Sequence, residues 1–493
     1  MPNDLSQSPH YKWWVLAVVQ CSILLVGLDS TIVNLALPTI TRHFHSSVHL
    51  SQWVVSAYFI TTALALPAAG RLADMLGRKT VFVGGFAVFT IGSVLCGLAP
   101  SVEALIAMRV LQAIGGAALL ANSNVITLAV FPFEQHGMAM GVNGTVFALG
   151  YALGYTLGGY FIHALGWRSI FLVNLPIGIL AILLGLFVLV EARITPGKKS
   201  GQVFDYTGAI FSVLAIGGLM VSLEGWVTEG QLGGINLMLL MIGVASMALF
   251  IAAELRNPSP MLDVRLFRLP LFSIGTSTRL LYNGIVASCA FVIPFYTQLA
   301  LGYTPLQSGM IMLPYSMALA VCGPLAGRLS DRFGSRLMTT GSFVSGCLAL
   351  LWLSTLKAAG PGSTADDTLF KVIAGMFFLG GTSGFFVSPN NSITLDSVPP
   401  SATGSASGCL WCVGFLGSAL GTAFSAAMLH HGLSDAGGKA ALQEKLHGAL
   451  DPVVAASLLH AQTQVFYILL IFSAAGGILC FMRGSGPHKK KTT

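Results

Sequence analysis

The sequence predicts an all-α polytopic membrane protein, on the evidence of few charges, long apolar runs and a duplicated charged loop. Of the 493 residues, 54% are hydrophobic and only 9% are charged, whereas an ordinary soluble domain carries roughly 25% charged residues. So few charges cannot cover a soluble surface. The composition therefore excludes a soluble enzyme, a disordered scaffold and a nucleic-acid-binding protein, in spite of a formal net charge of +7.

Fourteen apolar runs are each long enough to cross a bilayer, which takes about 20 helical residues. Barrel strands would alternate polar and apolar residues, and these runs do not. Lone sheets cannot cross lipid, because every backbone polar group there needs an internal partner. The runs lie near residues 13–38, 50–70, 80–99, 103–129, 137–163, 168–190, 206–224, 235–253, 271–299, 305–328, 336–357, 368–389, 403–428 and 462–482.

Lys and Arg are distributed unevenly between the two sets of loops. The side that holds both termini carries seventeen of them and the opposite side carries six, while Arg109 and Arg279 lie inside spans. Positive residues concentrate in cytoplasmic loops. We therefore expect both termini in the cytoplasm, and the basic balance needs no acidic partner.

The loops after the second and tenth spans share one motif. Residues Gly70–Lys79 read GRLADMLGRK and residues Gly327–Arg336 read GRLSDRFGSR. Both fit G-R-L-x-D-x-x-G-x-R/K, and both are predicted to be cytoplasmic. Two matched loops so far apart indicate two homologous halves, an arrangement common in transporters, whose substrate site lies at the midplane between repeats.

Six spans in each half leave two spans over. We therefore predict an N-terminal six-helix bundle at 1–190, a linker with two additional transmembrane helices at 191–270, and a C-terminal six-helix bundle at 271–493. The second bundle would carry an external loop near 430–460, where the sequence is hydrophilic.

Charged residues inside a span are costly and are functional candidates by default. Asp29 is the only acid well inside a span. At 1.5 Å per residue, Asp29 lies roughly 14 Å and Arg109 roughly 9 Å from the same outer end, so the two are expected to share a hydrated zone. A carboxylate whose surroundings alternate between burial and a basic neighbour changes its proton affinity. This pair is our candidate proton-coupling site; the alternative is a fixed ion pair between helices.

The other intramembrane cation, Arg279, lies roughly 12 Å from the inner end of its span. A cation there suits either an anionic group of a substrate or the carbonyls of a helix end. The polar residues Asn34, Asn283 and Gln298 are further candidates for substrate contacts.

The paired loops place Asp74 and Asp331 beside arginines and between helix ends, where an acid near a helix N-terminus gains about 0.3–1 kcal/mol. Partners that meet in only one conformation would make each loop a latch. The alternative is a static loop that only sets topology. The gating candidates are Gly70, Asp74, Gly77, Arg78, Asp331 and Arg332.

Four further motifs occur in order along the chain. Residues Leu28–Pro38 read LDSTIVNLALP, Arg109–Gly116 read RVLQAIGG, Phe204–Gly208 read FDYTG, and Leu301–Gly309 read LGYTPLQSG. Together with the paired loops, they make the chain resemble the major facilitator superfamily, and in particular its fourteen-span drug:proton antiporter branch. The resemblance covers nearly the whole chain.

This resemblance implies a major facilitator fold and transport by alternating access. It implies coupling roles for Asp29 and Arg109, and a gate at the paired loops that stabilises the outward-open state. It also implies a monomer in a plasma membrane of the bacterial inner-membrane type. Its partners would be a small-molecule substrate, protons and the lipid bilayer.

The fifth span carries a glycine stripe at Gly150, Gly154 and Gly158, which allows close helix packing. The antiporter motif of the family usually has proline after the first two glycines, and here those positions are Tyr151 and Tyr155. Because proline bends a helix, we expect a straighter helix. The departure leaves antiport less specifically indicated than transport.

Aromatic residues also stand at Trp411 and Phe415, where the branch usually has polar ones. With Tyr151 and Tyr155 they indicate a pocket for a flat or greasy molecule. The alternative is that these rings face lipid or pack in the core.

No phosphate-binding loop, catalytic triad or metal cluster occurs in the sequence, so we expect no cofactor and no enzyme activity. His43, His45 and His49 lie in a short external loop without acidic or Cys support and are expected to be solvated. With no ATPase motif, the energy for transport must come from a gradient.

The main hypothesis is a proton-coupled exporter of small amphipathic or hydrophobic compounds. The first rival is a facilitator or importer of an anionic or lipid-like metabolite, favoured by Arg279 and the altered fifth span. The second rival is a membrane sensor or scaffold, which would be expected to carry a soluble signalling domain.

Overall fold

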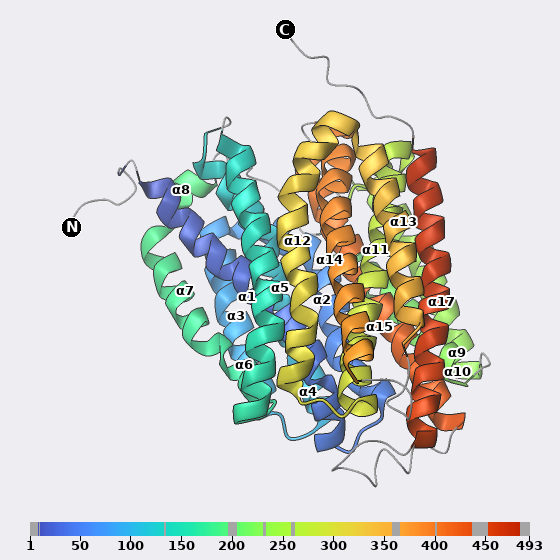
Figure 1. Ribbon diagram of the computed structural model, residues 1–493. Helices are drawn as coiled ribbons and strands as arrows, with labels where there is room; N and C mark the ends of the chain where they lie inside the picture. Colours follow the sequence, from blue (N-terminus) through green and yellow to red (C-terminus); the bar gives the residue numbers. More distant parts are fainter. Residues whose placement is uncertain are drawn as a thin grey trace. The chain divides into compact units, whose positions relative to one another are not determined.

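The fold is entirely helical in the part of the chain that the structure describes (Figure 1). Within that part, fourteen helices are long and apolar enough to cross a membrane. Both the predicted fold class and the predicted number of spans are confirmed. The computed structural model describes residues 8, 10–132, 135–195, 205–229, 233–257, 262–356, 365–399, 402–435 and 452–483.

The chain divides into two compact units. Unit 1 comprises Met1–Leu262 with Thr304–Gly309, and unit 2 comprises Asp263–Tyr303 with Met310–Thr493. The predicted division into two bundles and a separate linker stays a prediction.

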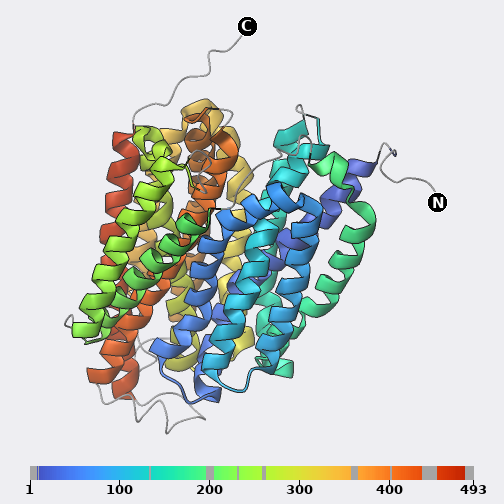
Figure 2. The same ribbon diagram turned by 180° about the vertical axis from the view of Figure 1, so that it is seen from behind.

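Unit 1 contains the first eight long helices and two short ones. Helices α9 and α10 run side by side as a pair (Figure 2). The bounds are α1 (Tyr11–His43), α2 (Val48–Leu76), α3 (Arg78–Leu98), α4 (Val102–Val130), α5 (His136–Leu165), α6 (Ser169–Leu172), α7 (Asn174–Val188), α8 (Glu191–Ile194), α9 (Tyr206–Glu229) and α10 (Gly234–Arg256).

Unit 2 is built from the remaining helices, and α11 passes directly into a π-helical turn, η4. The bounds are η3 (Val264–Arg268), α11 (Pro270–Phe295), η4 (Tyr296–Ala300), α12 (Pro305–Phe333), α13 (Ser335–Ser354), α14 (Ala365–Asp396), α15 (Thr403–Asp435) and α17 (Pro452–Met482).

Several helices are longer than the apolar runs that predicted them. Helix α14 continues to Asp396 and α17 begins at Pro452, whereas the runs end near 389 and begin near 462. Backbone hydrogen bonds extend a helix whatever the polarity of its side chains. Helix therefore covers both ends of the segment expected as an external loop, and residues 436–451 lie outside the described part.

The glycine stripe of α5 lies against α1. A Cβ on Gly150 would lie 2.9 Å from the Leu24 carbonyl oxygen, and one on Gly154 would lie 2.8 Å from the Leu28 carbonyl oxygen. Real Cβ atoms do not approach backbone so closely, so glycine is what allows the two helices to meet. The helix itself is continuous through Tyr151.

Unit 2 repeats this contact between its corresponding helices. A Cβ on Gly421 of α15 would collide with the Gly284 carbonyl of α11, as one on Gly154 of α5 would with Leu28 of α1. The register of the two units therefore matches Leu28 with Gly284, and the next residue, Asp29, with Ile285.

Asp205 ties the two ends of the α9–α10 pair together. Its Oδ1 accepts hydrogen bonds from the Gly208 amide at 2.8 Å and the Thr207 hydroxyl at 2.7 Å, and its Oδ2 accepts one from Asn257 Nδ2 at 2.7 Å. Burial would raise the pKa of the Asp205 carboxyl, but these hydrogen bonds outweigh it and lower the pKa below its ordinary value. This is a structural account of the FDYTG motif, whose Phe204 lies outside the described residues.

We predict that Gly154→Ala destabilises the protein by about 1–3 kcal/mol, because the added methyl group overpacks the contact with α1. The measurement is the melting temperature of the purified protein in detergent.

Gly144→Ala is the matched control on the same helix, since a Cβ there meets nothing within 4 Å. It should leave the melting temperature unchanged or raise it slightly, because alanine favours a helix by about 0.5–1 kcal/mol over glycine. Equal melting temperatures for the two variants would contradict the proposed packing.

Candidate functional site

A buried ion pair lies at the centre of the candidate site in unit 1. Arg109 Nη1 on α4 donates to Asp29 Oδ2 on α1 at 2.7 Å, and the two side chains are 1% and 0% exposed. Removing one partner of such a pair leaves an uncompensated buried charge and typically costs 3–5 kcal/mol. The two charges predicted to share a zone of the membrane are therefore in direct contact.

Neutral groups complete the contacts of both charges. Gln112 Nε2 donates to Asp29 Oδ1 at 2.9 Å, and Gln112 Oε1 accepts from Arg109 Nη1 at 2.8 Å. Arg109 Nε donates to the Val54 carbonyl of α2 at 3.0 Å, and the guanidinium lies 4.1 Å from the centre of the Tyr58 ring. Both carboxylate oxygens of Asp29 thus accept a hydrogen bond.

The hydrogen bonds continue from Gln112 to three more helical segments. Gln112 Nε2 also donates to Ser93 Oγ on α3 at 3.2 Å, and Asn174 Nδ2 on α7 donates to the same oxygen at 3.0 Å. Ser93 Oγ in turn donates to the Phe171 carbonyl of α6 at 2.8 Å. A chain of hydrogen bonds therefore connects Asp29 on α1 with residues on α3, α4, α6 and α7.

The sequence brings Gln112 and Ser93 together through a glycine. A Cβ on Gly92 would lie 2.7 Å from the Gln112 backbone, so only glycine lets α3 approach α4 this closely. Sequence reasoning did not assign Gln112, although it stands three residues after Arg109 and therefore on the same helix face.

Among its described residues, unit 2 shows no counterpart of this network. The contact of α3 with α4 at Gly115 recurs between α13 and α14 at Thr382, which matches Arg109 with Met376. The buried residues of unit 2 that correspond to Asp29, Arg109 and Gln112 are all apolar: Ile285, Met376 and Leu379. At these three matched positions, only unit 1 carries ionisable groups.

The first of the paired loops is held by an ion pair and by a hydrogen bond to α4. Arg78 Nη2 lies 2.5 Å from Asp74 Oδ1, and Arg78 Nη1 donates to Asn122 Oδ1 of α4 at 3.3 Å. Gly77 has a φ of 103°, a left-handed value that favours glycine. A Cβ on Gly70 would meet nothing within 4 Å.

Glu191 of α8 caps the helix that follows this loop. Its carboxylate accepts hydrogen bonds from the backbone amides of Arg78 and Lys79, each at 2.8 Å. Amides in the first turn of a helix have no acceptor within the helix, so Glu191 supplies one for α3. The helix dipole also favours a negative charge at this end. The sequence analysis missed Glu191, which gave no signal beyond being an acid near a predicted linker.

Fewer contacts are described for the second paired loop. Gly334 has a φ of 86° and so repeats the conformation of Gly77. Arg332 is exposed and lies 5.4 Å from the centre of the Phe333 ring. The side chain of Asp331, also predicted to act in gating, lies outside the described part.

Most of the chain matches one known protein family. The family model of the Major Facilitator Superfamily matches residues 20–422. The chain belongs to this superfamily. It is therefore a membrane transporter and not an enzyme.

Relatives place this transporter in the fourteen-span branch of the superfamily that its motifs resemble. The riboflavin transporter RibZ of Clostridioides difficile is 31% identical over 416 residues, which cover 84% of this chain and 87% of that protein. The multidrug resistance protein Stp of Mycobacterium tuberculosis is 31% identical over 433 residues, which cover 87% and 78%.

The fold also matches a solved structure. The crystal structure of a bacterial homologue of the human lysosomal transporter Spinster aligns with a TM-score of 0.64 and 17% identity, and the match covers 97% of both chains. At this identity the match shows the facilitator fold.

The remaining predicted site residues of unit 1 lie on α1 and α5. Asn34 is 3% exposed; its Nδ2 donates to the Ser30 carbonyl at 3.2 Å, and its Oδ1 has no hydrogen-bond partner among the described residues. The Tyr151 ring lies 5.0 Å from that of Phe147, and Tyr155 is buried.

The predicted residues of unit 2 gather in two places. Arg279 and Asn283 of α11 lie near Trp411 of α15, whose ring stacks on Phe415 with a 6.1 Å separation of centres and a 26° angle between planes. Gln298 lies apart from them, buried in the π-helical turn η4.

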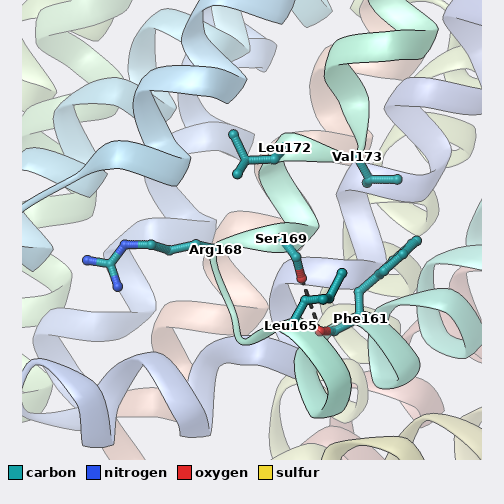
Figure 3. Close-up of a pocket in the computed structure, with 6 residues that line it drawn as sticks. All are labelled: Phe161, Leu165, Arg168, Ser169, Leu172 and Val173. Atoms are coloured by element: carbon teal, nitrogen blue, oxygen red, sulfur yellow. Dashed lines mark hydrogen bonds between the residues drawn. The ribbon is translucent and has the colours of Figure 1, made fainter.

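A shallow cavity at the loop between α5 and α6 does not make a second site (Figure 3). The walls are apolar apart from Arg168 and Ser169, and the Arg168 side chain points away from Phe161 and Leu165. Its guanidinium stacks 4.4 Å from the Trp167 ring centre and faces His43. Among the described residues, no three His, Cys, Asp or Glu side chains are grouped to hold a metal.

We predict that Glu191→Gln loosens the start of α3. The amide has one acceptor oxygen instead of two and carries no charge, so about 1–2 kcal/mol of capping is lost. Hydrogen exchange should rise at the Arg78 and Lys79 amides. Glu103→Gln, at the exposed first turn of α4, should leave those two amides unchanged, and equal protection in both variants would refute the cap.

Proposed function

We propose that the protein is a proton-coupled exporter of small amphipathic or hydrophobic compounds that works by alternating access. The observation that carries this proposal is the buried contact of Asp29 with Arg109 and Gln112. A carboxylate buried in a span is a proton-binding group whose protonation state the surrounding helices must sense.

Protonation gives this contact its role. A proton on Asp29 neutralises the carboxylate and replaces a charge-assisted hydrogen bond to Arg109 with a weaker one. The Arg109 guanidinium then depends mainly on Gln112, the Val54 carbonyl and the Tyr58 ring. Since these groups lie on different helices, proton binding favours one arrangement of α1 against α4, and proton release favours another.

The substrate must bias the same two arrangements for transport to be coupled to the proton. Asn34 lies little more than one helical turn from Asp29 on α1, and its buried Oδ1 offers an acceptor to a substrate or a water. The similarity of this chain to the multidrug resistance protein Stp supports the export of amphipathic compounds. A proton moving through 100 mV supplies about 2.3 kcal/mol for export.

The first paired loop supports the gating part of the proposal. Two contacts connect the start of α3 with its neighbours: Arg78 pairs with Asp74 near the end of α2, and Glu191 at the start of α8 accepts from the Arg78 amide. We propose that these contacts form in one state and break in another. In this view the loop is cytoplasmic, as are both termini, and the protein acts as a monomer in a membrane of the bacterial inner-membrane type.

A second function is favoured by Arg279. A buried guanidinium in unit 2 suits a facilitator or importer of an anionic metabolite, because guanidinium groups bind carboxylates and phosphates in two-point contacts. Such a protein would move its substrate down a gradient with no response to an imposed pH difference.

We predict that Asp29→Asn abolishes uphill transport but keeps downhill exchange. The amide cannot carry a proton, so the pH gradient has no group to act on, while substrate contacts remain. Accumulation in proteoliposomes with an imposed pH gradient, measured with rhodamine 6G and with fluorescein, should fall by more than about tenfold for each dye that the parent protein accumulates. Exchange of the same dye across the same membranes without a gradient should stay within about twofold.

Glu103→Gln is the control, because it removes an exposed acid from the same unit. It should behave as the parent protein in both assays, and monodisperse elution of each variant shows that it is folded. Full uphill transport by Asp29→Asn would rule out Asp29 as the coupling group. Parent protein that ignores the pH gradient would favour the facilitator.

A further inference from the structure

Unit 2 holds a cation that the coupling network does not use. Arg279 lies in the first half of α11 and is 7% exposed. Its Nη1 donates to Asn391 Oδ1 of α14 at 3.3 Å, and its guanidinium carbon lies 5.9 Å from the centre of the Trp411 ring. Three helices of unit 2 thus meet around one guanidinium.

The charge balance of this unit indicates what it attracts. Among the described spans, the last six, from Pro270–Ala300 to Val454–Met482, contain one acidic residue, Asp396, which is the last residue of its span. The position of unit 2 that matches Asp29 is the apolar Ile285. The ionic chemistry that these spans offer to a substrate at mid-membrane is therefore cationic, and its complement is an anion.

A glycine of α15 lies against two donor nitrogens at the same place. A Cβ on Gly414 of α15 would lie 3.3 Å from Arg279 Nε and 3.5 Å from Asn283 Nδ2. Asn283 Nδ2 also donates to the Arg279 carbonyl at 2.9 Å, which fixes the amide beside the guanidinium. A side chain at 414 would press on both nitrogens, so glycine lets α15 pack against the guanidinium and the amide without displacing them.

An aromatic surface adjoins these donors on the same helix. Trp411 and Phe415 stack one turn apart on α15. Phe415 is buried, whereas Trp411, Asn283 and Asn391 are each partly exposed. Trp411 thus has ring surface available beside the guanidinium, and an aromatic face of this kind favours a flat ring.

We propose that Arg279, Asn283, Asn391 and Trp411 bind a planar aromatic anion. The guanidinium and the amides hold the carboxylate, phenolate or phosphate group, and the indole stacks on the ring. This inference rests on the proposed export function and names its substrate class: among amphipathic compounds, this transporter selects those whose aromatic ring carries a negative charge.

The test uses two dyes that share a xanthene ring and carry opposite charges, fluorescein and rhodamine 6G. Binding to the purified protein is measured by quenching of Trp fluorescence. Uphill transport of each dye is measured in proteoliposomes with an imposed pH gradient. The parent protein should bind fluorescein at least tenfold more tightly than rhodamine 6G.

Arg279→Gln and Gly414→Ala should each weaken fluorescein binding by about tenfold or more, the effect of losing a hydrogen bond to a charged group. Rhodamine 6G binding should change by less than about twofold. Two variants are used because a buried arginine can matter for folding, whereas Gly414→Ala adds only a methyl group.

Matched controls separate the site from its surroundings. Gly408→Ala lies on α15 where a Cβ meets nothing within 4 Å, and Arg268→Gln removes an exposed cation. Both should bind fluorescein as the parent does. Trp411→Leu should weaken fluorescein binding as well, since it removes the stacking surface.

Failure of this inference differs from failure of the proposed function. Equal binding of the two dyes, or unchanged fluorescein binding in Arg279→Gln and Gly414→Ala, overturns the aromatic anion site even if a pH gradient drives transport. Tight, Arg279-dependent fluorescein binding without any response of transport to the gradient keeps the site and overturns proton-coupled export.

Discussion

The need to compensate one carboxylate inside the membrane determines how unit 1 is built. Asp29 is 0% exposed, and a buried charge is stable only when it is paired and hydrogen-bonded. Helix α4 must therefore present both Arg109 and Gln112 to α1. That in turn requires α3 to approach α4 closely at Gly92, and Ser93 to receive the second hydrogen bond of Gln112.

The two units keep one backbone arrangement and differ in side-chain chemistry. Glycines on α5 and α15 bring each helix against its partner at matching positions, yet the ion pair of unit 1 is replaced by apolar residues in unit 2. On α11, unit 2 carries a buried cation six residues before the matching position, at Arg279 instead of Ile285. Because backbone packing is fixed by the glycines, each half can change its polar groups without rebuilding the fold.

Sequence reasoning reached the spans, the repeat and the two charges of the network, because a charge in an apolar run stands out at once. It did not reach Gln112 or Ser93, since neutral polar residues are common in spans and their partners depend on helix rotation. Glu191 was missed because its partners are backbone amides more than a hundred residues away. Helices extend beyond the predicted apolar spans, as at Pro452, because hydropathy marks the membrane core and not the end of the helix.

The hydrogen bond between Asp205 and Asn257 has a consequence for the path of the chain through α9 and α10. The two residues stand just before α9 and just after α10, and their side chains meet at 2.7 Å. The chain thus enters and leaves the helix pair at one point. Because entry and exit coincide, a change in the length of the pair leaves the spacing of the segments on either side unchanged.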